Sequence, residues 1–346
     1  MTAHPLPPTA VLERYELDPT TVLPLAGGLI NRSYSASRRD GGDFVLQRVN
    51  PIFPREIHED IDAVTRHLAA KGLTTPLLVA TTDARRFVEL DGEIWRLLTR
   101  VPGTTQEAIS TADEAREAGR VLGEFHRAVA DFDQPLKNRR PPVHELGRHL
   151  TSLDSALAQH LRHRAHRAVA AIADRILSMA TTLAPLEVQP PRLVHGDPKI
   201  SNIVFRNPPR VGVCLVDLDT LTRIPVALEI GDALRSWCNT ATEDSPAAKF
   251  SVERFVAAIA GYREGAGRLL TAAEWRAVPT ATQTIAVELA ARFAADALNE
   301  SYFAWDRQRF SSASEHNQAR ALGQLKLAAS IAGALPELGA CVMTRA

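Results

Sequence analysis

The feature that most constrains this chain is the stretch LVHGDPKISNIVF, residues 193–205, which sets a polar cluster between two short apolar runs. His195, Asp197, Lys199 and Asn202 fall within eight positions of one another. The flanking runs have the length and composition of strands, so the four side chains are expected on the loop between them. Such a loop predicts a functional site.

A further carboxylate follows this loop at a spacing typical of phosphoryl transfer. Asp197 and Asn202 are five positions apart, and Asp217 lies at the end of the next apolar run. Kinases use this order, with the first Asp as base and the Asn and second Asp as metal ligands. Asn and Asp oxygens suit Mg²⁺, and a carboxylate beside them can accept the proton of an attacking hydroxyl. Lys199 can lie against the transferred phosphate. One isolated Asp–Asn pair is common by chance, but the whole ordered set makes chance a poor explanation.

The run VCLVDLDTL adds a second acidic residue next to Asp217. If the extended geometry persists, Val213, Leu215, Asp217 and Asp219 share one face of the strand. Both carboxylates would then face one cleft, where one holds metal and the other a substrate hydroxyl. The sequence leaves open which of the two is the main metal ligand.

The order of the patterns predicts two lobes. Residues 1–19 are rich in proline and are expected to form an extension or a short first helix, and residues 20–100 form a small β-rich lobe. A hinge near 98–103 leads into a large, mostly helical lobe over 101–346, whose small hairpin carries the polar cluster. The fold class is therefore α+β and bilobal.

Local signals place several elements within these lobes. RRDGGD and Asp91-Gly92 are hairpin turns, since Asp-Gly and Gly-Gly supply positive φ angles. Apolar spacing predicts a helix ending near Gly72, and Thr111 is the expected N-cap of another helix. Further helical stretches are expected within 144–184 and at 226–240, 250–268, 272–298 and 313–334.

Composition excludes several classes of partner. The chain has 40 basic and 40 acidic residues, so no net charge favours nucleic acid or an anionic membrane. The N-terminus has neither a basic nor an apolar signal region, and Pro336 and Glu337 interrupt the most apolar late stretch, so no spanning helix is expected. Three scattered cysteines predict reduced thiols and a cytoplasmic location. The oligomeric state does not follow from the sequence.

HGDPKISN and LVDLD resemble the catalytic signature of the aminoglycoside phosphotransferase and choline kinase-like family, which has a protein-kinase-like fold. Four stretches are similar to the N-acetylhexosamine 1-kinase branch of that family: GGLINRSY (27–34), FVLQRVN (44–50), LVDLDT…EIGDALR (215–235) and ELAARFAADALNESYF…HNQARALGQLKL (288–327). The resemblance runs through most of the chain and implies ATP and Mg²⁺ as cofactors.

The resemblance also implies roles for residues of the catalytic loop. Asp197 is the catalytic base, Asn202 and Asp217 hold Mg²⁺, and His195 holds the backbone of the loop. Asp232, in GDALR, would brace the loop from the following helix, although a simple acid near a helix N-terminus explains it equally well.

For the nucleotide, the resemblance implies contacts from the small lobe and the hinge. The expected residues are Gly27, Gly28, Asn31, Ser33, Arg48, Glu59, Leu98 and Val101. Arg48 lies where kinases place a phosphate-binding lysine, but Gln47 points to the opposite face, and either one could face the phosphates. The acid that partners this position could be Glu56 or Glu59, and a solvated helix face explains those two acids nearly as well.

The residues predict transfer of phosphate to a small-molecule hydroxyl but do not identify the acceptor. The resemblance implies the anomeric hydroxyl of an N-acetylhexosamine, with Asp197, Asp219, Arg292 and Tyr302 as substrate contacts. On spacing alone, a surface ion pair between Glu288 and Arg292, four positions apart on a helix, explains Arg292 better than a substrate contact. Leu29 stands where the sugar kinases place a histidine, which puts the sugar in question.

Other acceptors and other functions stay open. A choline-, homoserine- or aminoglycoside-type kinase would have the same catalytic core, although zero net charge disfavours a polycationic aminoglycoside. A non-catalytic nucleotide-binding module would not need Asp197, Asn202 and Asp217 together. A metal hydrolase built on His195-x-Asp197 would need further histidines in register.

Overall fold

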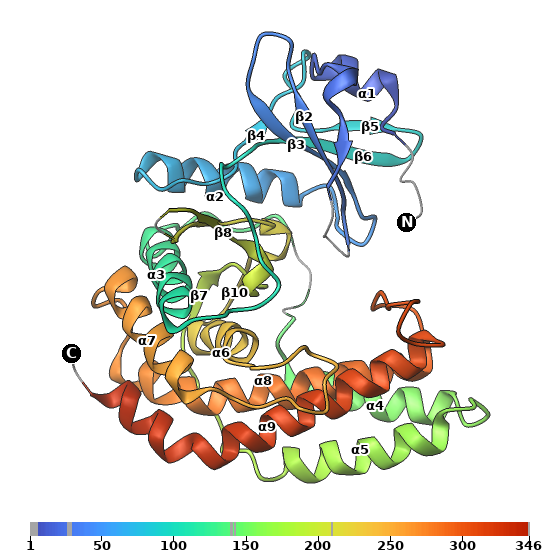
Figure 1. Ribbon diagram of the computed structural model, residues 1–346, viewed down its shortest axis with the longest axis vertical. Helices are drawn as coiled ribbons and strands as arrows, with labels where there is room; N and C mark the ends of the chain where they lie inside the picture. The colour runs from blue at the N-terminus through green and yellow to red at the C-terminus, as the bar shows by residue number, and fades with distance from the viewer. Residues whose placement is uncertain (1–5, 26–29, 139–140, 142, 209, 345–346) are drawn as a thin grey trace. The chain divides into compact units, whose positions relative to one another are not determined.

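The computed structural model describes residues 6–25, 30–138, 141, 143–208 and 210–344, and the chain forms two compact units (Figure 1). The first unit comprises residues 1–104, 131–140 and 216–221. The second comprises residues 105–130, 141–215 and 222–346. Two late segments of the chain therefore belong to the first unit, an interleaving that the expected lobes 20–100 and 101–346 did not include.

An antiparallel sheet forms the first unit. Its strands run in the order β1 (Leu23–Pro24), β2 (Arg32–Ser37), β3 (Asp43–Val49), β6 (Glu93–Thr99) and β4 (Leu78–Val79), and β5 (Val88–Leu90) pairs with β6. Gly41 and Gly42 turn β2 into β3 with φ angles of 107° and 91°. Asp91 and Gly92 turn β5 into β6 with φ angles of 51° and 77°. Both predicted hairpin turns are confirmed.

The two faces of this sheet differ in chemistry. Tyr34, Leu46 and Leu97 are aligned across β2, β3 and β6 and are buried on one face. Helix α1 (Thr9–Arg14), followed by the short helix η1 (Pro19–Thr21), adds Val11 and Leu12 to this core. In the described part of residues 1–19, the short helix expected from the sequence is observed. The neighbouring register Ser33–Gln47–Arg96 is polar and lies on the opposite face.

Helix α2 (Ile57–Ala70) completes the first unit with an amphipathic stripe. Ile57, Ile61, Val64 and Leu68 are buried at the predicted helical spacing. The helix ends at Ala70 with Lys71 as its C-cap, and Gly72 follows with a φ angle of 78°, which confirms its predicted place after the C-cap.

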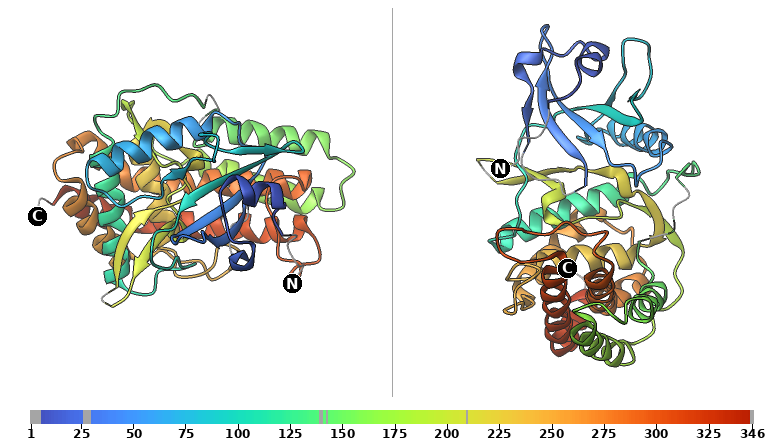
Figure 2. Two further views of the ribbon diagram at one scale, coloured as in Figure 1. Left: turned by 90° about the horizontal axis from the view of Figure 1, so that it is seen from above. Right: turned by 90° about the vertical axis from the view of Figure 1, so that its right-hand side faces the viewer.

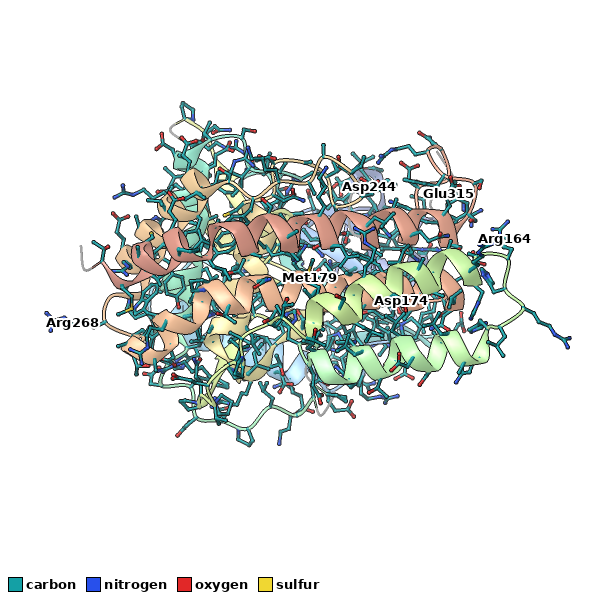
Figure 3. All side chains as sticks on the ribbon, turned by 90° about the horizontal axis from the view of Figure 1, so that it is seen from below. Arg164, Asp174, Met179, Asp244, Arg268 and Glu315 are labelled. Carbon is teal, nitrogen blue, oxygen red and sulfur yellow. The ribbon has the colours of Figure 1, made fainter. Side chains whose placement is uncertain are left out.

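The second unit is mostly helical. Its helices are α3 (Ala112–Ala128), α4 (Leu146–Gln159), α5 (His166–Ala180), α6 (Val226–Trp237), α7 (Val252–Ala266), α8 (Ala272–Asn299) and α9 (Ala313–Met343). Helix α9 lies along α8, with α4 and α5 packed against α8; Asp174 and Met179 mark α5 in Figure 3. The right-hand view of Figure 2 looks nearly along these helices. Thr111 caps α3 in a reciprocal capping box with Glu114, as predicted.

Helix α9 continues through Pro336 instead of stopping near residue 334 as expected. By length and composition alone it could cross a membrane, which the sequence did not predict for any segment. A core helix of a soluble protein passes the same test, and α9 buries one side, including Leu325, Leu327 and Ile331, within the second unit.

Helices α3 and α7 approach each other so closely that only glycine fits at their contact. A Cβ at Gly261 would lie 1.8 Å from the backbone oxygen of Arg116, and one at Gly119 would lie 2.0 Å from that of Ala258. Gly123 and Gly265 repeat the contact one turn further along. These two helices therefore pack backbone to backbone.

Two small strand pairs carry the functional loop. Strand β7 (Pro191–Val194) pairs with β10 (Thr222–Pro225), and β8 (Ile203–Arg206) pairs with β9 (Val211–Leu215), all antiparallel. The segment between β7 and β8, which ends in the short helix η2 (Ile200–Asn202), is the predicted loop. We call residues 195–202 the catalytic loop.

Candidate active site

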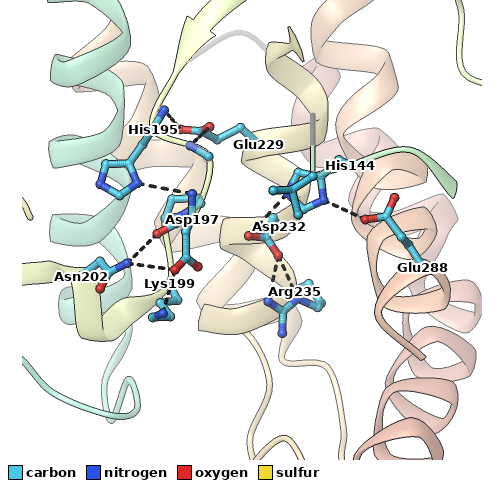
Figure 4. Close-up of polar contacts among 12 residues, drawn as sticks. His144, His195, Asp197, Lys199, Asn202, Glu229, Asp232, Arg235 and Glu288 are labelled. Atoms are coloured by element: carbon cyan, nitrogen blue, oxygen red, sulfur yellow. Dashed lines mark hydrogen bonds and ion pairs between the residues drawn. The ribbon is translucent and has the colours of Figure 1, made fainter. Parts of the chain in front are cut away.

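Asp197 is the centre of the catalytic loop (Figure 4). Its Oδ2 accepts a hydrogen bond from Lys199 Nζ at 2.7 Å and one from Asn202 Nδ2 at 3.2 Å. Asn202 Nδ2 also donates to the Asp197 backbone oxygen at 2.9 Å, which closes the loop on itself. Among the residues the structure describes, none donates to Asp197 Oδ1. One carboxylate oxygen is therefore held in place and the other is available to a ligand.

A buried carboxylate on α6 shapes the start of this loop. Glu229 Oε1 accepts the backbone N–H of His195 at 2.9 Å, and Oε2 accepts that of Gly196 at 2.8 Å. Gly196 has a φ angle of 86°, which favours glycine. His195 is fully buried, and its Nδ1 accepts the backbone N–H of Asp197 at 3.3 Å. Glu229, one turn before Asp232, is thus the residue that braces the loop, and the brace predicted at Asp232 was wrong.

Asp232 belongs instead to a charged cluster beside the loop (Figure 4). Its Oδ1 accepts from two nitrogens of Arg235, at 2.8 and 3.2 Å. His144 Nδ1 lies 3.0 Å from Glu288 Oε1, and His144 Nε2 lies 3.8 Å from Asp232 Oδ2. We call Asp232, Arg235, His144 and Glu288 the charged cluster.

The charges of this cluster act on one another. Burial alone would lower the pKa of His144, but the hydrogen bond to Glu288 and the charge of Asp232 raise it above its ordinary value. Burial alone would raise the pKa of Asp232, but Arg235 and His144 hold it below its ordinary value. The cluster therefore favours a charged histidine between two carboxylates.

Arg292, which the sequence offered as a substrate contact, lies on α8 near this cluster, since its charge acts on both His144 and Asp232. Its guanidinium lies over the rings of Tyr302 and Phe303, at 5.9 and 5.5 Å from their centroids. Among the described residues it has no hydrogen-bond or ion-pair partner. The Tyr302 side chain is exposed in the segment after α8.

Asp217 lies in a segment of the first unit, residues 216–221, that we call the anchored loop. Strand β9 ends at Leu215, and Asp217 adopts left-handed backbone angles of φ 67° and ψ 56° before the short helix η3 (Leu218–Thr220). The extended geometry therefore does not persist, and the prediction that Asp217 and Asp219 share one strand face was wrong. Asp is among the residues that tolerate this backbone conformation.

Asp219 is buried in a polar network of the first unit. Arg96 NH2 donates to Asp219 Oδ2 at 2.9 Å, and Arg96 NH1 donates to Oδ1. Asn31 Nδ2 donates to Oδ2 at 2.6 Å. Burial alone would raise the pKa of Asp219, but Arg96 lowers it below its ordinary value. Both oxygens of Asp219 accept hydrogen bonds, and only 2% of its surface is exposed. Asp219 is therefore part of a buried network and does not face an open cleft.

The predicted nucleotide residues of the first unit divide between the two sheet faces. Arg48 pairs with Glu93 at 2.5 Å on the face of the apolar core, while Gln47 faces the opposite side. The expected acid partner on α2 was wrong, because Glu56 and Glu59 are exposed and Arg48 uses Glu93 instead.

The remaining predicted nucleotide contacts are distributed along the same unit. Ser33 and Leu98 lie on the Gln47 face of the sheet, and Val101 follows β6 half-buried. Gly27 and Gly28 lie outside the described residues. Whether these positions touch a nucleotide stays a prediction.

Asn202 and Asp217 have the chemistry that a magnesium site requires. The amide nitrogen of Asn202 is used inside the catalytic loop, and its Oδ1 accepts no hydrogen bond from the described residues. Asp217 is half-buried and supplies a carboxylate. In the described part of the chain no group of three or more His, Cys, Asp or Glu forms a metal cage. Mg²⁺ is typically held by one or two carboxylates together with substrate phosphates, so the side-chain oxygens of each residue, taken by itself, suit that ion.

Sequence reasoning missed the residues that orient the predicted ones. Glu229, Arg96, His144 and Glu288 carry no motif spacing, and each meets its partner at long range. Burial of a charged residue inside an apolar stretch is the one local signal: Arg96 stands within EIWRLLT and Glu288 within IAVELAA. A charge at such a position requires a buried partner.

Comparison with solved structures shows the fold. The chain superposes on the amicoumacin kinase hAmiN in complex with AMP-PNP, Ca²⁺ and Ami with a TM-score of 0.63, at 16% identity, covering 92% of this chain and 91% of that one. A microcompartment-associated aminopropanol kinase gives a TM-score of 0.61 at 17% identity, covering 95% and 97%. The predicted protein-kinase-like α+β fold is confirmed.

Curated relatives resemble the chain over most of its length. The homoserine kinase of Granulibacter bethesdensis is 27% identical over 282 residues, 80% of this chain and 81% of the relative. That of Methylocella silvestris is 25% identical over 291 residues, 81% and 82%. These names do not point to the N-acetylhexosamine 1-kinase branch. The model of the phosphotransferase enzyme family matches residues 21–267, so the chain belongs to the phosphotransferase enzyme family.

Proposed function

We propose that this protein is a cytoplasmic, Mg²⁺-dependent kinase that transfers the γ-phosphoryl group of ATP to the hydroxyl of a small amino-bearing alcohol, with homoserine as the first candidate. The observation that carries the proposal is the state of Asp197. One carboxylate oxygen is fixed by Lys199 and Asn202, and the other has no donor among the described residues. That arrangement suits a base that accepts the proton of an attacking hydroxyl.

In this mechanism each residue of the catalytic loop has a distinct task. Asp197 orients the acceptor hydroxyl and takes its proton as the oxygen attacks phosphorus. Lys199 places a positive charge beside that carboxylate, where it can follow the transferred phosphoryl group. Glu229 keeps the loop backbone in shape by holding two of its N–H groups. Asn202 and Asp217 would hold the magnesium ion, which when bound would neutralise the phosphate oxygens.

Arg292, beside the charged cluster, favours an acceptor that carries a negative charge. Asp232 and Glu288 are already paired with Arg235 and His144, so the ammonium group of the acceptor is supported by the named relatives alone. Arg292, without an ion-pair partner among the described residues, suits a carboxylate. Homoserine has a hydroxyl, an ammonium and a carboxylate, and the relatives named homoserine kinase support it as the first acceptor to test.

A matched pair of acceptors tests this proposal. Homoserine and 3-aminopropan-1-ol differ in the carboxylate alone, so their kcat/KM values measure what that group contributes. We expect wild type to prefer homoserine. The Arg292→Met variant should raise the KM for homoserine by about tenfold or more, the scale of a lost charge-assisted bond. It should leave the KM for 3-aminopropan-1-ol within about twofold of wild type, because that acceptor has no carboxylate for Arg292 to bind.

An N-acetylhexosamine is the second candidate acceptor. The support is the similarity of residues 27–34, 44–50, 215–235 and 288–327 to the sugar kinases, and the anomeric hydroxyl is acidic enough for a carboxylate base. The same assay includes N-acetylglucosamine, N-acetylgalactosamine and one aminoglycoside. Turnover of a sugar at a kcat/KM above that of both amino alcohols would overturn the amino-alcohol proposal.

A further inference from the structure

A buried ion pair ties the anchored loop, residues 216–221, to the sheet of the first unit. Arg96 lies in the middle of β6 with 1% of its surface exposed. Its two terminal nitrogens donate to the two carboxylate oxygens of Asp219, a two-pronged contact that fixes both the distance and the orientation of the carboxylate. The side chains of both residues are 1% exposed. The contact is therefore screened from water.

Neutral side chains form the other hydrogen bonds of Arg96 and Asp219. Gln47 Oε1 accepts from Arg96 Nε at 2.9 Å and from Arg96 NH2 at 2.7 Å. Gln47 Nε2 in turn donates to Ser33 Oγ at 3.0 Å. Asn31 donates to Asp219 and accepts the backbone N–H of Asn50 at 2.9 Å. A network in which each member has its partners holds its side chains in one arrangement.

Arg96 places a positive charge on this sheet, whose strands contain no lysine. All five lysines of the chain lie outside the strands of the first unit, at positions 71, 137, 199, 249 and 326. On β3, the residue that shares a face with Arg96 is Gln47, and it serves the arginine as an acceptor. Arg96 is thus the cation that this face provides, and it is committed to the anchored loop.

The position of Asp219 restricts that of Asp217. The two residues are separated only by Leu218, which is itself buried, and a short helix over Leu218–Thr220 makes this stretch rigid. Asp217 sits at the start of that helix in a left-handed conformation that few side chains adopt. A buried pair often gives no more stability than an apolar pair of the same volume, so stability alone does not explain why this one is present.

We propose that Arg96 is a positioning residue, which through Asp219 holds the anchored loop in the conformation that presents Asp217 to the magnesium nucleotide. The role of Asp217 in this statement rests on the proposed function. The anchoring of residues 216–221 by Arg96 does not, and it can be measured without turnover.

The test replaces Arg96 by lysine, which keeps the charge but cannot form the two-pronged contact. Arg192→Lys is the matched control, because Arg192 also donates two bonds to a buried carboxylate, that of Glu274, at 2.7 and 3.2 Å. Hydrogen exchange of the amides of residues 216–221 should be at least tenfold faster in Arg96→Lys and unchanged in Arg192→Lys. The Mg²⁺ concentration that half-saturates ADP binding in calorimetry should rise about tenfold in Arg96→Lys alone.

Activity adds an independent readout. In Arg96→Lys, kcat should fall at limiting Mg²⁺ and recover in part at high Mg²⁺, with the acceptor KM within about twofold of wild type. A folded Arg96→Lys protein with wild-type exchange at 216–221 and wild-type Mg²⁺ dependence would overturn the proposal. If wild type transfers phosphate to no acceptor, the proposed function fails, while the exchange measurement still decides whether Arg96 anchors the loop.

A second variant covers the case in which lysine is not tolerated. The double change Arg96→Gln with Asp219→Asn removes both charges together and leaves no buried ion unpaired. We expect this protein to fold and to show the same faster exchange at residues 216–221. Wild-type exchange and wild-type Mg²⁺ dependence in the double variant would equally contradict the proposal.

Discussion

The shape of the catalytic loop depends on a single carboxylate, that of Glu229. Its two oxygens accept the N–H groups of His195 and Gly196. Bonds from N–H groups to a buried charge are stronger than neutral ones, and an unsatisfied buried donor is costly. The conformation of the catalytic loop therefore depends on its bonds to Glu229 on α6 as well as on the bonds within the loop.

The first prediction concerns Glu229→Gln. Glutamine offers one acceptor and turns an N–H₂ group toward the other backbone donor, so we expect a loss of about 2–4 kcal/mol in unfolding free energy. Turnover should fall at least tenfold because the loop loosens. Urea unfolding and kcat check this, with Glu337→Gln on the exposed side of α9 as the same chemical change. Equal stability of both variants would show that the brace is unimportant.

The second prediction is a pH dependence at His144. Its pKa in the folded protein is raised above the ordinary 6.5, so the stability it contributes is present in full below about pH 6.5 and is lost as pH rises through the folded-state pKa. His144→Gln should therefore destabilise more at about pH 5.5 than at about pH 9. Urea unfolding at both pH values is the measurement.

His149 serves as the contrasting control. Burial lowers its pKa, so its contribution is present above the ordinary value and is lost as pH falls. His149→Gln should show the opposite trend, with the larger loss at high pH. Parallel trends in the two variants would contradict the account of the charged cluster.

At the scale of elements, the contact of α3 with α7 is the least tolerant part of the fold. We predict that Gly261→Ala lowers the unfolding free energy by about 3 kcal/mol or more, since its Cβ would lie 1.8 Å from the Arg116 oxygen and the two backbones would have to move apart. Gly333→Ala in α9, with nothing within 4 Å, should stabilise by about 0.5–1 kcal/mol. Thermal unfolding of the pair compares them. A mild effect at Gly261 would mean that the helices are further apart than described.

Elements whose limits are set by nearby residues were predictable from the sequence. The Thr111 cap and the Asp91-Gly92 turn follow from chemistry within four residues. The end of β9 at Leu215 and the continuation of α9 past Pro336 did not follow, because both are decided by packing against distant parts of the chain.

In the candidate site, too, the residues close together in sequence were predictable and those far apart were not. The catalytic loop was predictable because its functional side chains are neighbours in sequence. The pairing of Arg96 with Asp219 spans 123 positions, and the apolar stretch around Arg96 indicates a buried partner without identifying it. The partners that orient a site are thus the part that sequence alone conceals.

At the scale of the whole molecule, the first unit is completed by later segments of the chain. Asp60 on α2 accepts the backbone N–H groups of Lys137 and Asn138 at 2.7 and 2.8 Å, and Arg96 receives Asp219. We predict that residues 1–104 expressed alone do not unfold cooperatively, because a buried guanidinium and a buried carboxylate lose their partners. Calorimetry checks this. A sharp transition in that fragment would show that the first unit folds independently.

The most direct test of the central claim is phosphorus NMR of the products formed from MgATP and the acceptor panel by wild type and Asp197→Asn. We predict that a phosphomonoester signal grows as the γ-phosphate signal disappears in wild type. In Asp197→Asn it should grow about 10²–10⁴-fold more slowly, the usual contribution of a general base, while MgATP binding stays intact. Release of inorganic phosphate alone from every acceptor, or an unchanged rate in Asp197→Asn, would contradict the account.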